Sequence, residues 1–106
     1  MAGVVLAAMM LAGCGVQPGR SLMTFQRGGT QAPPLADVEN SGWYALYPGN
    51  GLTPLDSVLL HKGDQFGFGM DNGKIAGVYV KNKHPGYIPL TGVLTSEYIW
   101  KYQGEK

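Results

Sequence analysis

The stretch QFGFGMDNGKIAGVYV, residues 65–80, decides the fold of this chain. Asp71-Asn72-Gly73 stands at its centre, and Asn-Gly supplies the two positive φ angles that a type I′ hairpin turn requires. We therefore expect residues 65–70 and 74–80 to form neighbouring antiparallel strands joined by this turn.

The first of these strands has two very different faces. Side chains alternate along a strand, which puts Phe66, Phe68 and Met70 on one face and Gly67 and Gly69 on the other. A face of almost bare backbone suits a tightly curved barrel or the close approach of another strand.

Outward from the hairpin, the chain from residue 42 onward consists of short strand-type runs separated by turn residues, and no stretch has helical periodicity. The sequence predicts an all-β domain over residues 42–106, a small five-stranded antiparallel barrel. Closing a sheet into a barrel would remove most of its exposed edges. Four further runs lie at residues 43–47, 57–61, 87–90 and 98–102, which with the hairpin makes six candidate runs for the five strands of the barrel, and a turn is expected over residues 82–85.

Three short motifs of this domain resemble the SH3 family. Ala45-Leu46-Tyr47 looks like the opening of an SH3 domain, Lys62-Gly63-Asp64 falls where that family turns after its first long loop, and Gly86-Tyr87-Ile88-Pro89 resembles the segment before its short helical turn. The resemblance implies an SH3-like barrel over about residues 42–102.

In peptide-binding SH3 domains, a proline-rich ligand lies across aromatic side chains, and Tyr47 and Pro89 match two of those positions. The tryptophan that follows the hairpin in that family has no counterpart, because residues 77–80 are Gly-Val-Tyr-Val. Envelope members of the SH3-like class in bacteria often contact cell-wall material, which makes cell-wall material a possible ligand here.

The N-terminal residues resemble the leader of a bacterial lipoprotein. An uncharged apolar run, too short for the ~20 residues of a membrane span, leads to Leu11-Ala12-Gly13-Cys14, the pattern of a lipobox. The resemblance implies removal of residues 1–13 as a signal peptide and lipidation of Cys14, which would attach the protein to a membrane of the cell envelope. Gly15 stands where an aspartate retains some Gram-negative lipoproteins in the inner membrane, so the outer membrane, facing the periplasm, is expected in a Gram-negative cell.

Residues 14–41 are rich in Gly, Pro, Gln, Ser and Thr, and we expect a flexible tether with a reach of roughly 25 to 30 Å. Leu22, Met23 and Phe25 are the apolar exception, and they could dock on the domain as an added strand.

Charge and residue types exclude several functions. Eight basic and seven acidic residues give a net charge of +1 without a basic cluster, which argues against nucleic-acid binding. His61 and His84, with Asp64 and Asp71 as possible companions, lack the spacing of known metal motifs. No serine lies in a nucleophile elbow, and Cys14 is assigned to lipid. The sequence predicts no cofactor, no metal and no catalysis.

Aromatic residues are numerous for so small a domain. Alternation places Trp43 with Tyr47 on one strand face; the core is the favoured place for Trp43 and Trp100, and Tyr44 and Tyr47 are the candidates for a ligand surface. We expect a non-catalytic interaction module with an envelope protein or cell-wall partner. A peptidoglycan- or glycan-binding module and, less favoured, a small envelope enzyme or metal-dependent hydrolase are the alternatives.

Overall fold

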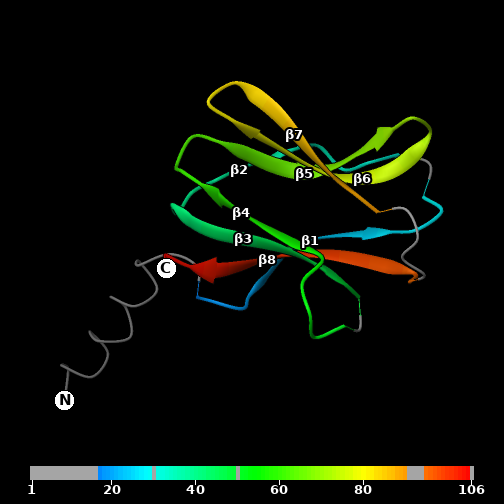
Figure 1. Ribbon diagram of the computed structural model, residues 1–106, viewed down its shortest axis with the longest axis horizontal. Coiled ribbons are helices and arrows are strands. Elements are labelled where there is room, and N and C mark those ends of the chain that lie inside the picture. The colour runs from blue at the N-terminus through cyan, green and yellow to red at the C-terminus, as the bar shows by residue number, and fades with distance from the viewer. Residues whose placement is uncertain (1–16, 30, 50, 91–94, 106) are drawn as a thin grey trace, which may run out of the picture.

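The computed structural model of the chain describes residues 17–29, 31–49, 51–90 and 95–105, and these form strands, turns and loops (Figure 1). The predicted leader and Cys14 lie outside the described residues. Over the described ranges, no helix is long and apolar enough to cross a membrane. The strands are β1 (Ser21–Gln26), β2 (Ala36–Asp37), β3 (Gly42–Pro48), β4 (Asp56–Leu60), β5 (Gln65–Asp71), β6 (Lys74–Lys81), β7 (His84–Pro89) and β8 (Glu97–Gly104).

The strands form two four-stranded antiparallel sheets, one in the order β1-β8-β3-β4 and the other in the order β2-β5-β6-β7. The two sheets lie face to face as two layers, the second above the first in Figure 1. The predicted all-β, antiparallel fold is confirmed, with eight strands in the described residues where five were expected.

The extra strands come from the segment expected to be a tether. β1 and β2 lie within residues 14–41, so this segment is not a free spacer at either strand. β1 pairs with β8 along the open edge of the first sheet, and the Phe25 side chain is buried in the core. The expectation that Leu22, Met23 and Phe25 add a strand is therefore confirmed.

The predicted hairpin is present. β5 and β6 pair from Gln65 to Asp71, and Asn72 and Gly73 take φ angles of 56° and 73°. A second turn of the same kind joins β6 to β7, where Asn82 and Lys83 take φ angles of 50° and 68°. This turn is tighter than the expected one over residues 82–85, and β7 therefore begins at His84.

Aromatic rings from both sheets form the core. Trp100 of β8 is fully buried, and its indole nitrogen donates a hydrogen bond of 2.8 Å to the backbone oxygen of Gly67 on the opposite sheet. Its core position confirms the prediction for this tryptophan. The buried cluster comprises Phe25, Val38, Tyr44, Leu46, Leu60, Phe66, Phe68, Ile88, Leu90, Tyr98, Trp100 and Tyr102.

Two glycines allow this packing. A Cβ on Gly77 would stand 2.7 Å from Cδ2 of Leu46 and 3.4 Å from Cζ2 of Trp100, so the bare backbone of β6 receives those side chains. On the outer face of β5, a Cβ on Gly67 would meet Cδ2 of Leu35 at 2.7 Å. Leu35 directly precedes β2, which confirms the expected close approach of another segment to this face.

Candidate functional site

The candidate site lies on the outer face of the first sheet. In β3 the side chains of Tyr44 and Leu46 point into the core, and strand alternation turns Trp43, Ala45 and Tyr47 outward. Together with neighbouring side chains, these three surround a depression of about 480 Å³, which we name the aromatic trough. It is lined by Trp43, Ala45, Tyr47, Pro54, Ser57 and Gln103.

Strand register fixes the trough's shape. Ala45 faces Ser57 of β4 on one side and Lys101 of β8 on the other, and it is the smallest side chain of this row. Trp43 and Tyr47, two residues before and after it, rise as walls on either side of this floor. Sequence position and register thus place two aromatic rings along one strand with a small gap between them.

The trough offers both apolar rings and polar groups. Trp43 is 36% exposed, and the Nζ atom of Lys101 stands 4.7 Å from the centroid of the Tyr47 ring, a cation–π contact that orients the phenol. Within the described part of the chain, the Ser57 hydroxyl and the Gln103 side-chain amide have no hydrogen-bond partner in the protein. Both groups can therefore donate to and accept from a ligand.

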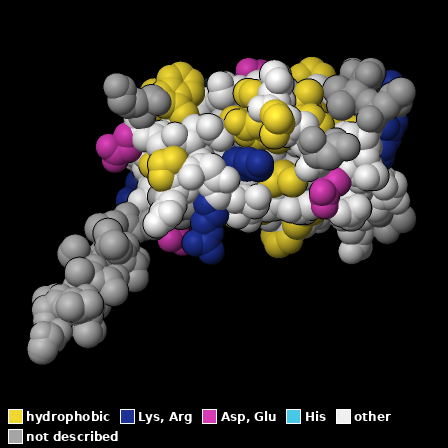
Figure 2. Space-filling view, turned by 90° about the horizontal axis from the view of Figure 1, so that it is seen from below, with side chains coloured by type: hydrophobic (Ala, Val, Ile, Leu, Met, Phe, Trp, Pro, Cys, Tyr) yellow, Lys and Arg dark blue, Asp and Glu magenta, His cyan; other side chains and the backbone are white. Residues whose placement is uncertain are grey.

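Figure 2 shows the face of the molecule that carries this sheet. Hydrophobic side chains gather over it next to a basic side chain, and acidic side chains lie toward its margins. The trough is thus part of a mixed apolar and polar face, as is common at interaction sites.

The residues that the sequence selected as ligand-binding are not brought together. Tyr44 was expected at the surface, but it is 2% exposed and faces the core. It lies three positions from Tyr47, an odd number, so the two side chains point to opposite faces of β3. Pro89 is exposed on β7, opposite Ala76, on the outer face of the second sheet. Only Tyr47 belongs to the trough, so the groove implied by the SH3 resemblance is not assembled.

Trp43, favoured as a core residue from the sequence, is instead the most exposed aromatic wall of the trough. Alternation already grouped it with Tyr47, and the buried position of Trp100 was separately expected. Alternation in the sequence does not reveal which of the two faces of β3 packs against the other sheet, and this choice decides whether Trp43 is buried.

Burial changes the titration of two tyrosines beneath the trough. Loss of hydration raises the pKa of Tyr44, with a smaller effect of the nearby Tyr102, and burial likewise raises the pKa of Tyr102. The two rings are 5.2 Å apart, and the Tyr44 hydroxyl donates a hydrogen bond of 2.6 Å to the Asn40 carbonyl. The folded protein therefore favours the protonated, uncharged form of both phenols, and they serve the packing of the sheet.

The candidate metal residues have other positions. His61 and His84 are exposed, and the buried carboxylate of Asp64 accepts hydrogen bonds from the backbone nitrogens of His61, at 2.8 Å, and Asn82, at 3.3 Å. Asp64 thus ties two neighbouring turns together. Among the residues that the structure describes, no three His, Cys, Asp or Glu side chains are grouped to hold a metal ion.

No family model matches the chain, and neither a curated protein nor a solved structure is significantly similar to it. The geometry of the trough and the sequence of the leader therefore carry the information on function.

Proposed function

We propose that the protein is a lipid-anchored cell-envelope protein whose β domain is a non-catalytic binding module, with the aromatic trough as its site for a glycan of the envelope. The observation that carries this proposal is the pair Trp43 and Tyr47, exposed on one strand face on either side of Ala45.

A glycan matches this surface chemically. The C–H face of a sugar ring is apolar and stacks on an indole or a phenol, and its hydroxyl groups take hydrogen bonds around the edge of the ring. Ser57 and Gln103 stand at the trough with free donors and acceptors, and Lys101 adds a cation beside Tyr47. An anionic or neutral sugar polymer such as peptidoglycan fits these groups.

Lipid attachment at Cys14 would hold the module close to the membrane. Gln17 is the first described residue, and Gly19 donates a backbone hydrogen bond to Tyr102 at the end of β8. Gln17 lies three positions after Cys14, with two residues between them, which gives a reach of at most about 11 Å. The spacer is then far shorter than the tether expected from composition.

The glycan site is tested with purified peptidoglycan and with soluble glycan fragments. Trp43→Ala and Tyr47→Ala should each weaken binding at least tenfold, because each removes one stacking ring. Tyr87→Ala is the matched control, since Tyr87 is 50% exposed on the other sheet. No retention of the unaltered protein, or an equal loss in the Tyr87 variant, would refute the glycan site.

The lipid anchor is tested separately by metabolic labelling with a fatty-acid analogue in cells that express the full chain. Cys14→Ala should abolish the label and release the protein from the membrane fraction. Labelling that persists in this variant would contradict the anchor and leave the glycan test unaffected.

A further inference from the structure

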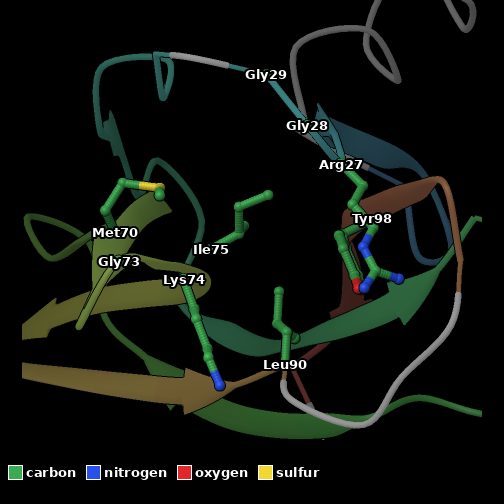
Figure 3. Close-up of a pocket in the computed structure, with 9 residues that line it drawn as sticks. All are labelled: Arg27, Gly28, Gly29, Met70, Gly73, Lys74, Ile75, Leu90 and Tyr98. Atoms are coloured by element: carbon green, nitrogen blue, oxygen red, sulfur yellow. The ribbon is translucent and has the colours of Figure 1, made fainter.

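A second depression opens at one end of the two-layered domain, away from the aromatic trough. It has a volume of about 420 Å³, and we name it the end pocket. Figure 3 shows its lining residues, which come from the loop after β1, the β5–β6 hairpin, the end of β7 and the start of β8. They are Arg27, Gly28, Gly29, Met70, Gly73, Lys74, Ile75, Leu90 and Tyr98.

The inner wall of the end pocket is continuous with the hydrophobic core. Leu90 and Tyr98 belong to the buried cluster, and Ile75 packs against it. Met70 is 53% exposed at the mouth, although it is a large apolar side chain. An apolar ligand entering here would cover Met70 and contact core side chains without displacing a sheet.

The rim of the pocket is basic. A Cβ built on Gly28 or Gly73 would have no heavy atom within 4 Å, so the rim is open at both glycines. Arg27 and Lys74 are the charged residues of the lining, and no carboxylate is among them. Within the described residues Lys74 makes no ion pair, and the Arg27 side chain lies beside Tyr98 (Figure 3).

We propose that the end pocket binds an anionic amphiphile with a single acyl chain, of which a fatty-acid carboxylate is the simplest member. The chain lies against Met70, Ile75 and Leu90, and the carboxylate stays at the rim, where Lys74 and Arg27 supply positive charge. Small-molecule sites typically combine an apolar wall with placed polar groups in a volume of several hundred Å³, and the end pocket has both kinds of surface. This proposal does not depend on the glycan site or on the lipid at Cys14.

The ligand class is tested by calorimetric titration of the full chain, carrying no lipid at Cys14, with dodecanoate below its micelle concentration. Dodecyltrimethylammonium, with the same chain and the opposite charge, and acetate, with the same carboxylate and no chain, are the comparison ligands. Dodecanoate should bind at least tenfold more tightly than either. Equal affinity of the anionic and cationic amphiphiles, or no binding of dodecanoate, would overturn the proposal.

The position is tested with variants. Lys74→Glu should weaken dodecanoate binding at least tenfold, because it reverses the charge at the rim. Met70→Gln should weaken it several-fold, because it removes apolar surface from the chain's path, and the exposed position of Met70 lets the variant fold. Lys62→Glu is the matched control, since Lys62 is exposed in the turn after β4. Amide NMR signals of Gly28 and Gly73 should shift on titration. Equal weakening in the Lys62 variant, or shifts confined to Trp43 and Tyr47, would place the ligand elsewhere and refute the end pocket.

Discussion

Gly77 is the residue on which the central packing depends. Its missing side chain lets Leu46 and Trp100 of the first sheet approach the backbone of β6. Gly77→Ala should lower the free energy of unfolding by about 1–3 kcal/mol, the usual range for an overfilled core.

Gly69→Ala is the matched control, because there the added Cβ meets a single side-chain atom, Cγ2 of Val78 at 3.1 Å, instead of the closer Leu46 contact at Gly77. Urea unfolding followed by tryptophan fluorescence compares the two variants. A Gly77 variant as stable as the Gly69 variant would contradict the close packing of the two sheets at this point.

The buried tyrosines predict how stability depends on pH. Because burial raises the pKa of Tyr44 and Tyr102 above the ordinary value near 10, the folded state keeps protons that the unfolded chain loses. Their contribution is complete below about pH 10 and is lost as the pH rises through the folded-state values. The free energy of unfolding should therefore fall above about pH 10.

Tyr44→Phe should make this alkaline fall shallower, and it should cost about 1 kcal/mol at neutral pH through the lost hydrogen bond to Asn40. Tyr87→Phe, at an exposed site, is the control. Urea unfolding across the alkaline range measures both. An unchanged pH profile in the Tyr44 variant would show that this phenol does not carry the effect.

At the scale of the elements, the β6–β7 turn contains a residue whose backbone conformation is unfavourable for its side chain. Lys83 occupies the left-handed region, at φ 68°, in the second position of a type I′ turn. A side chain there costs roughly 1–2 kcal/mol, and glycine costs roughly 0.5–1 kcal/mol in chain entropy. Lys83→Gly should therefore raise the free energy of unfolding by about 0.5 kcal/mol, as measured by the denaturation midpoint. Lys74→Gly, in an extended strand, should lower it, and a Lys83 variant of lower stability than the parent would contradict the turn assignment.

The elements that could be predicted from sequence are those with a local cause. Asn72-Gly73 determines its turn by its own backbone preferences, and the hairpin follows from it. β1 and β2 depend instead on partners distant in sequence, the edges of β8 and β5, which composition does not reveal. For the same reason alternation grouped Trp43 with Tyr47 correctly but left open which face of β3 is buried. That choice depends on the opposite sheet, so Trp43 rather than Tyr44 forms the candidate site.

At the scale of the whole molecule, the first described residues and the end pocket lie at opposite ends of the same strands. Gly19 bonds to Tyr102 near the end of β8, whereas Arg27 bonds to Ser96 just before its start. The six residue steps from Ser96 to Tyr102 separate these ends by roughly 20 Å. A lipid at Cys14 would therefore hold the Gly19 end near the membrane and leave the end pocket facing away from it.

This orientation predicts the outcome of an NMR experiment on vesicles. Protein beginning at Cys14, coupled through its thiol to a lipid, is compared on vesicles with and without a paramagnetic headgroup. Amide signals of Gly19 and Gly63 should broaden more than those of Gly28 and Gly73. Gly63 follows β4, whose last residue Leu60 pairs with Gly42, and the start of β3 pairs with the end of β8, where Gly19 is bound. The short reach from Cys14 to Gln17, at most about 11 Å, prevents the domain from tumbling freely above the surface. Equal broadening at both ends would contradict this orientation, because it would mean that the Gly19 end of the domain is no closer to the vesicle surface than the end pocket.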